Sequence, residues 1–167
     1  MGDGPNYYDL LMRRRDEQRR QNAGAKLIIK EADLPVEVNP QGLMRWYLHP
    51  AMTDRAVRSE ILYVQTIPAG SRSGKQHHPG GVLFYFWQGQ GHTVIDDDQF
   101  PWRAGELLQL PHRVDGCTFQ HYNGSASEDA KVIVVELNMS ESLGVDRGSG
   151  LEQIEAAPEF ASGVDGA

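Results

Sequence analysis

The sequence predicts an all-β barrel or sandwich with one helix in front of it. Between Lys26 and Asn138, short runs of β-branched and aromatic residues alternate with turn formers such as Asn-Pro, Pro-Gly-Gly and Asn-Gly. No long helical pattern separates these runs, which favours antiparallel strands over a parallel sheet with helical crossovers. The segment from Tyr7 to Asn22 consists instead of helix formers.

The chain divides into three parts by character. Residues 1–25 are expected to be a helical extension, 26–140 the β domain, and 141–167 a partly ordered C-terminal extension rich in Gly, Ser and Glu. A length of 167 residues suffices for one domain with a core. The expected strands cover residues 26–32, 43–49, 60–68, 82–88, 92–96, 106–111, 117–123 and 131–138.

The predicted N-terminal helix has apolar residues only in its first turns, between Tyr7 and Met12. We expect these turns to dock on the β domain or on a partner subunit. Five arginines with acids between them follow, a pattern typical of a solvated helix face. Contact with nucleic acid or with an anionic ligand is the alternative.

Charge, hydropathy and cysteine content argue against a nucleic-acid-binding, membrane-spanning or disulfide-bonded protein. The net charge of −7 argues against nucleic-acid binding, because a surface that follows phosphates needs a basic excess. No apolar run approaches the length of a membrane helix, and the first residues lack the pattern of a secretory signal. Cys117 is the only cysteine, so an internal disulfide is excluded and a reducing compartment is the simple expectation. We therefore expect a soluble cytoplasmic protein.

One stretch of the β domain has the spacing of a known motif. Gly70 is followed after five residues by the run from Gln76 to His78, after three more by Val82, and after six more by Gly89. This spacing resembles the first motif of the cupin family. That motif has a glycine, a His-x-His pair, a Glu and a closing glycine at these intervals.

A second stretch resembles the other cupin motif. Gly105 and Pro111 open it, and Gly116, Phe119 and Asn123 close it after an insertion of three residues.

The cupin resemblance covers residues 60–138 and implies a fold. The expected fold is a cupin-type double-stranded β-helix, a jelly-roll barrel, behind the N-terminal helical extension. Among cupins, the chain looks most like gentisate-dioxygenase-type and related small single-domain members. The resemblance also implies a homodimer, to which residues 1–60 are long enough to contribute.

The resemblance implies a metal site in which several ligands are replaced. In metal-binding cupins the ligands would occupy positions that hold Gln76, His78, Val82 and Phe119 in this chain. His121 lies two residues beyond Phe119, on the same face of its strand. We therefore predict one divalent metal ion bound by His78 and His121, with Gln76 as a weak ligand. Fe(II) is the favoured ion, with Zn, Ni or Mn as alternatives.

Strand alternation decides which neighbours share the inner wall of the barrel. If Gln76 and His78 face inward, His77 points away from the interior. The same alternation places Cys117 on the inner face of its strand, where a small buried hydrophobe is a more common role than a metal ligand.

Four residues are candidate substrate contacts. Val82 and Phe119 would make the pocket apolar, and Arg45 on an early strand would hold a carboxylated substrate. His92 follows a glycine turn at the barrel rim, and alternation across such a turn leaves open whether it faces inward or outward.

These residues support several functions. The favoured hypothesis is a metal-dependent, dioxygenase-like oxidoreductase that acts on a small organic substrate, either aromatic or carboxylated. The alternative is a metal-free cupin that binds a small molecule or acts as an isomerase or accessory protein. A third possibility is a structural or partner-binding cupin whose pocket is filled by aromatic side chains. No membrane or nucleic-acid partner is expected.

Overall fold

Two antiparallel β-sheets make up the body of the computed structural model, which describes residues 4–138 and 150–163. The six-stranded sheet has the order β1 (Glu37–Asn39), β2 (Gly42–Leu48), β3 (Glu60–Ile67), β10 (Ala130–Leu137), β5 (Val82–Gln88) and β8 (Leu107–Leu110). The five-stranded sheet has the order β11 (Glu152–Glu155), β4 (Lys75–His78), β9 (Cys117–Asn123), β6 (Gln90–Ile95) and β7 (Asp98–Arg103). The helices are α1 (Tyr7–Ala23) and α3 (Pro158–Ala161), with a 3-10 turn at Glu31–Asp33.

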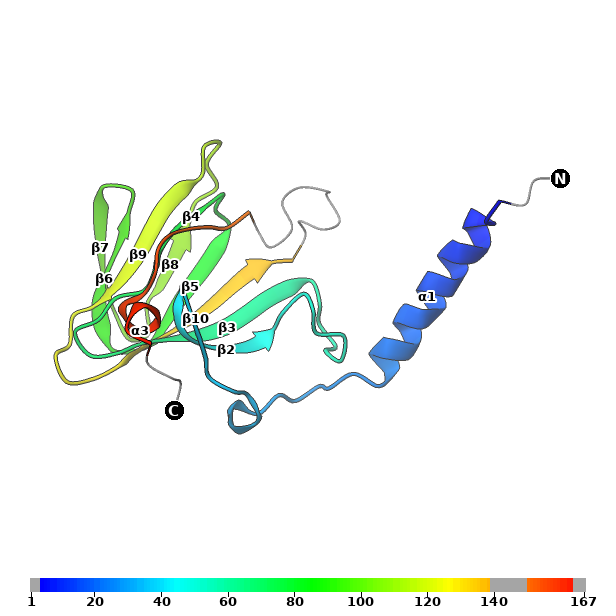
Figure 1. Cartoon of the computed structure of the whole chain (residues 1–167), viewed down its shortest axis with the longest axis horizontal. Coiled ribbons are helices and arrows are strands. Elements are labelled where there is room, and N and C mark those ends of the chain that lie inside the picture. The colour runs from blue at the N-terminus through cyan, green and yellow to red at the C-terminus, as the bar shows by residue number, and fades with distance from the viewer. Residues whose placement is uncertain (1–3, 139–149, 164–167) are drawn as a thin grey trace.

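Figure 1 shows the sheets curved into one body, with α1 standing apart from it. The predicted all-β fold with an N-terminal helix is confirmed.

Alternating burial along the strands builds the core between the sheets. In β3 every second residue from Ile61 to Ile67 is buried, and β5 likewise buries Val82, Phe84 and Phe86. Side chains on one face of a strand point the same way, so these positions meet the buried residues of the other sheet. The two sheets therefore share one apolar core, whose burial drives folding.

Seven of the eight expected strands are present, each within a few residues of its expected ends. The expectation for residues 26–32 is wrong. Leu27 and Ile28 are 86% and 79% exposed, and Lys26 makes only an isolated bridge to Arg55. This segment spans the gap between α1 and the barrel, where its apolar residues find no neighbouring strand to pair with (Figure 1).

The structure adds strands that the sequence pattern did not indicate. β7 lengthens the hairpin that follows β6, and β11 brings the C-terminal extension back to pair with β4. The C-terminal extension was expected to be partly ordered. The structure describes it from residue 150 to 163, and the rest lies outside the described residues.

The N-terminal helix begins at Asn6, whose side-chain oxygen accepts a hydrogen bond from the Asp9 N–H at 3.2 Å. None of its residues is buried, and Tyr7 and Leu11 are 78% and 61% exposed. Its first turns therefore do not dock on the barrel, and contact with a partner subunit stays a prediction. No helix in the described part of the chain is long and apolar enough to cross a membrane.

Candidate site at the barrel mouth

Strand β4 presents the motif residues as alternation predicts. Gln76 and His78 are buried on the inner wall, and the His77 side chain lies on the other face. The His77 ring hydrogen-bonds the backbone oxygen of Asp115 at 2.8 Å, which ties down the loop before β9. His77 is therefore a structural histidine outside the barrel.

His78 is held at both of its ring nitrogens. Nδ1 accepts a hydrogen bond from the Gly80 backbone N–H at 2.9 Å, and Nε2 lies 3.0 Å from a carboxylate oxygen of Glu136. Because Nδ1 is an acceptor, the ring carries its proton on Nε2 and donates it to the carboxylate. The side chains of His78 and Glu136 are only 6% and 12% exposed, so the pair lies in surroundings of low polarity.

Glu136 is the functional candidate that sequence reasoning missed. It lies on β10 directly opposite Val82 of β5, the position where the cupin motif has its Glu. The carboxylate inside the barrel thus comes from β10, which neighbours β5, the strand in which Val82 stands where the cupin motif has Glu. The available signal was the alternation of β10, in which Val132 and Val134 are buried and position 136 shares their face. A charged residue on such an inward face is a candidate for function.

Aromatic side chains surround this pair at one end of the barrel. Tyr63 on β3 is buried, and its ring lies 4.8 Å from that of Trp46 on β2. Burial, followed by the nearby charge of Glu136, raises the pKa of Tyr63 well above its usual value. The Tyr63 hydroxyl therefore stays protonated at neutral pH and can donate a hydrogen bond.

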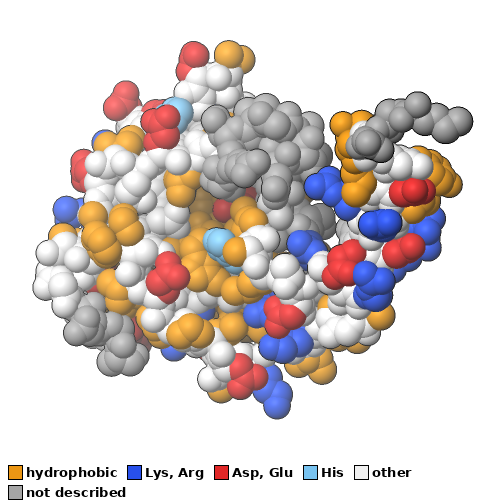
Figure 2. Space-filling view, turned by 45° about the vertical axis from the view of Figure 1, so that its right-hand side comes forward, with side chains coloured by type: hydrophobic (Ala, Val, Ile, Leu, Met, Phe, Trp, Pro, Cys, Tyr) orange, Lys and Arg blue, Asp and Glu red, His pale blue; other side chains and the backbone are white. Residues whose placement is uncertain are grey.

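We call the end of the barrel formed by Trp46, Tyr63, His78, Val82 and Glu136 the barrel mouth. β10 ends and β3 begins at this end, because Glu136 pairs with Ile61. Figure 2 shows a hollow lined mainly by hydrophobic side chains on the face of the body that lies toward α1.

His121 lies at a different place on the same inner wall. The residue opposite His78 is Cys117, and His121 is four residues further along β9. At about 3.3 Å per residue, the two histidines are separated by roughly 13 Å along the strands. The structure therefore does not bring the two predicted histidine ligands together.

The surroundings of His121 are almost wholly apolar. Its ring is fully buried and meets three aromatic rings with centroids 4.6 to 5.8 Å away, those of Phe84, Phe86 and Phe119. Nδ1 lies 2.7 Å from the hydroxyl of Thr93, which itself accepts a hydrogen bond from the Trp102 indole at 3.0 Å. Nε2 has no hydrogen-bond partner among the described residues. Burial lowers the pKa of His121 to about 3, so the ring is neutral.

Solved structures with the same architecture come from several organisms. A Cupin 2 conserved barrel domain protein from Salinispora arenicola matches 66% of this chain and 86% of its own length, with a TM-score of 0.52 and 16% identity. An uncharacterized conserved protein with a double-stranded β-helix domain from Klebsiella pneumoniae matches 78% of this chain and 98% of its own, with a TM-score of 0.55 and 12% identity. The chain has the cupin fold.

One further structural neighbour is a vicilin. The vicilin of Solanum melongena, for which different anionic ligands in structurally similar pockets are described, has a TM-score of 0.54 and 20% identity. The match covers 74% of this chain and 32% of the vicilin. No family model matches the sequence, and no curated protein matches it either. Identities this low establish the fold and leave the function to the site itself.

The positions of the four cupin ligands do not fit a four-ligand metal centre in this chain. Val82 and Phe119 are 2% and 5% exposed and belong to the apolar core, where neither can ligate. Both ring nitrogens of His78 already have partners. The Gln76 amide points to Gln153 of β11 with a long contact of 3.4 Å. Among the described residues, no three His, Cys, Asp or Glu side chains are grouped to hold an ion.

Two predicted substrate contacts lie outside the barrel. Arg45 alternates with the inward residues of β2 and reaches Glu31 at 3.5 Å on the outer side. His92 precedes the buried Thr93, and its ring stacks on that of Tyr122 with centroids 4.8 Å apart. The structure therefore does not place Arg45 or His92 at the barrel mouth. Both placements follow from strand alternation, because Arg45 is next to the buried Met44 and His92 is next to the buried Thr93, so each points to the outer face.

Proposed function

We propose that this cupin binds a small organic molecule at the barrel mouth and moves a proton on it by acid–base catalysis. The observation that carries the proposal is the His78–Glu136 pair, with its 3.0 Å contact and its small exposure. An acid–base pair needs a carboxylate or imidazole that is held in place, partly shielded from water and still reachable by the substrate. Two hydrogen bonds hold the His78 ring, both side chains are mostly shielded from water, and the remaining 12% exposure of Glu136 supports access by a small substrate.

The proposed step uses Glu136 as the base. Its carboxylate takes a proton from a carbon next to a carbonyl group, and the resulting carboxyl group delivers a proton to a different atom of the same molecule, so the product is an isomer. Exchange of the carboxyl proton with solvent before delivery introduces deuterium when the reaction runs in D2O. The Nε2–H of His78 steadies the carboxylate, while the Gly80 N–H fixes the orientation of the ring. Tyr63 stays protonated and would hydrogen-bond the carbonyl oxygen as negative charge develops there.

The lining of the mouth indicates the kind of substrate. Trp46 and Val82 supply apolar surface beside a single carboxylate, which favours a small molecule with an apolar or aromatic body and one polar end. The cupin fold of the Solanum melongena vicilin, with its described anionic ligands, supports the use of this architecture for small ligands.

Several expectations from the sequence stay predictions. They are a bound divalent ion such as Fe(II), a dioxygenase-like reaction, kinship to gentisate-dioxygenase-type cupins, and a cytoplasmic location. The homodimer also stays a prediction. It is supported by large apolar side chains that are exposed on the outer face of the six-stranded sheet, namely Leu83, Tyr85, Trp87 and Leu107.

The test follows proton exchange directly. Small carbonyl compounds with a C–H bond next to the carbonyl group, beginning with 2-oxo acids that carry aliphatic or benzyl side chains, are incubated with the protein in D2O, and NMR measures deuterium entering the substrate. Glu136→Gln and His78→Gln are each expected to slow exchange by about 10²- to 10⁴-fold. The matched control is His77→Gln, which changes the adjacent histidine on the other face and should leave the rate unchanged.

Metal content separates the two main hypotheses. Elemental analysis and a chelator control accompany the exchange assay. Exchange that persists in metal-free protein supports the acid–base pair. A reaction that requires an added ion and oxygen would instead support the metal-dependent oxidoreductase and overturn the proposal. Exchange that is equally fast in Glu136→Gln would also overturn it.

A further inference from the structure

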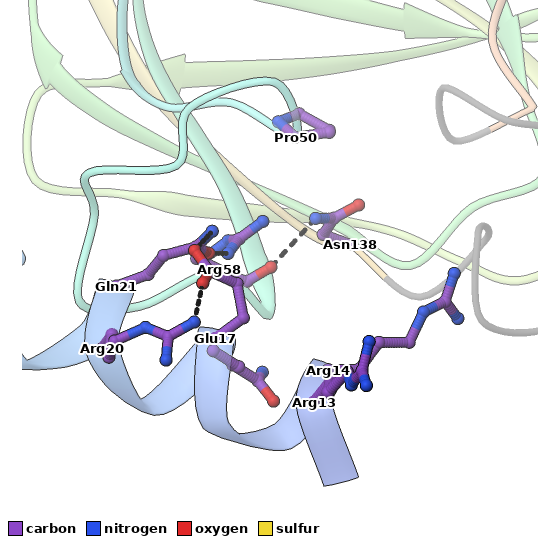
Figure 3. Close-up of a pocket in the computed structure, with 9 residues that line it drawn as sticks. Arg13, Arg14, Glu17, Arg20, Gln21, Pro50, Arg58 and Asn138 are labelled. Atoms are coloured by element: carbon purple, nitrogen blue, oxygen red, sulfur yellow. Dashed lines mark hydrogen bonds and ion pairs between the residues drawn. The ribbon is translucent and has the colours of Figure 1, made fainter. Parts of the chain in front are cut away.

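A cavity lies between α1 and the end of the barrel at which β10 ends and β3 begins, beside the barrel mouth. It has a volume of about 820 Å³, which is within the range of small-molecule sites. Figure 3 shows the helix on one side of the cavity and the chain around Pro50, Arg58 and Asn138 on the other. The lining residues are Arg13, Arg14, Glu17, Gln18, Arg20, Gln21, Pro50, Arg58 and Asn138.

The side of α1 that faces the barrel is polar over the segment that lines the cavity, residues 13–21. The lining residues of the helix recur at positions 13, 14, 17, 18, 20 and 21, which is the spacing of one helical face. None of them is buried. The direct link across the cavity is a hydrogen bond of 3.1 Å from the Arg58 guanidinium to the side-chain oxygen of Gln21. The helix therefore faces the barrel across a polar gap, without apolar packing.

The charge of this cavity is opposite to that of the whole chain. Four arginines line it against one acid, Glu17, which gives a local charge of +3 in a chain of net charge −7. Glu17 is already paired with Arg20. Arg13 and Arg14 have no acidic partner within 4 Å among residues 4–138 and 150–163. Arg58 donates to the Gln21 side chain and likewise has no acidic partner in the described part of the chain, so three guanidinium groups, on Arg13, Arg14 and Arg58, face the cavity without a described carboxylate to neutralise them.

Arg58 contributes the barrel side of the cavity, opposite the arginines of the helix. It belongs to the chain between β2 and β3, and its backbone oxygen accepts a hydrogen bond from the Asn138 amide at 2.9 Å, which anchors it to the end of β10. Arg13 and Arg14 belong to the helix. A ligand that contacts all three would bridge two parts of the chain that otherwise share few contacts. Planar guanidinium groups suit phosphate and carboxylate oxygens, to which they donate paired hydrogen bonds.

We propose that this cavity binds a small multivalent oxyanion, an organic phosphate or a polycarboxylate, and that the ligand holds α1 against the barrel. The site is separate from the His78–Glu136 pair, and its ligand does not take part in the proposed proton transfer. Four arginines around a cavity of this size fit an anion with at least two charged groups. A single charge would leave part of the positive charge unpaired.

The test is calorimetric titration of the full chain with inorganic pyrophosphate and, in a second series, with citrate. The two series distinguish phosphate from carboxylate recognition. The double variant Arg13→Gln/Arg14→Gln and the single variant Arg58→Gln are each expected to weaken binding at least about tenfold. The matched control is Arg15→Gln/Arg19→Gln, because it removes the same charge from the same helix at positions that do not line the cavity.

A second readout follows the helix itself. Bound anion should slow trypsin cleavage within α1 of the unchanged protein and of the control, and should have no effect on Arg13→Gln/Arg14→Gln.

Three results would overturn the proposal. The first is that neither anion binds at millimolar concentration. The second is an equal loss of affinity in the control, which would assign the effect to overall charge. The third is that a short DNA duplex binds through the same arginines more tightly than either small anion, which would identify nucleic acid as the ligand.

Discussion

The two ends of the inner wall carry the same type of residue in opposite surroundings. At the barrel mouth, His78 donates to the carboxylate of Glu136 and receives a hydrogen bond from Gly80. At the other end, the ring of His121 has a single hydrogen-bond partner, the Thr93 hydroxyl, and is otherwise enclosed by aromatic rings. Both histidines are buried, yet only the first has a charged partner.

This difference shows that burial alone does not make a histidine functional. A buried imidazole without a charged partner loses its proton and becomes part of the core, as the lowered pKa of His121 indicates. A buried imidazole beside a carboxylate keeps the polarity that proton transfer requires. The predictions below test whether the two ends differ as described, beginning with the largest effect.

The first prediction concerns the aromatic enclosure of His121. Phe119→Ala is expected to lower the free energy of unfolding by about 3–5 kcal/mol, because it leaves a cavity in a packed core. Urea denaturation followed by fluorescence measures this loss. Val114→Ala, at a fully exposed side chain, is the control and should change stability by less than about 0.5 kcal/mol. Phe→Ala in a packed core typically costs ~3–5 kcal/mol. A loss below about 1 kcal/mol in Phe119→Ala would therefore show that this end of the barrel is open and not packed.

The second prediction concerns pH. The pKa of His121 is about 3 in the folded chain and near 6.5 when unfolded, so between these values the unfolded state binds more protons. The contribution of neutral His121 is fully present above pH 6.5 and is lost as the pH falls, by up to about 1.4 kcal/mol per unit. Denaturation curves between pH 7 and pH 4 give the free energy of unfolding of the unchanged protein and of His121→Phe. The difference between the two proteins isolates His121, because the other titrating groups contribute equally to both. Identical pH slopes in the two proteins would contradict the neutral, enclosed histidine.

The third prediction concerns the stability of the mouth. Glu136→Gln keeps an oxygen that accepts from His78, so the expected cost is only about 1 kcal/mol, even though proton exchange is lost. The same denaturation experiment at pH 7 checks it. A cost above about 3 kcal/mol would show that the pair is chiefly a structural ion pair of the kind that is destabilising to break.

Much of the fold could be predicted because strand alternation and turn residues are local signals. They located seven strands and the inward direction of Gln76 and His78. Only the cupin resemblance singles out Asn123, and the structure gives it a structural role, because its side-chain amide donates to the backbone oxygens of Ile67, Pro68 and Glu128. For the strands and their alternation, a residue and its immediate neighbours contain the information.

The site could be predicted only in part because its geometry depends on register between strands. Alternation places His78 and His121 on one wall, but only the pairing of His78 with Cys117 shows how far apart they are. The partnership of His78 with Glu136 joins residues 58 positions apart in the chain. Nothing local in either segment indicates that contact, since it arises from the order of the strands in the sheets.

The pairing of β11 with β4 has a consequence for solubility. β4 would otherwise be the outermost strand of its sheet, with unsatisfied backbone groups available to another molecule. The final part of the chain covers that edge, and α3 continues from it with an N–H of Ala157 donating to Pro40 (Figure 1). All four residues of β11 are exposed, and two of them are glutamates. The strand that replaces β4 at the border is therefore charged, a feature that discourages edge-to-edge pairing with a strand of another molecule and the growth of fibres.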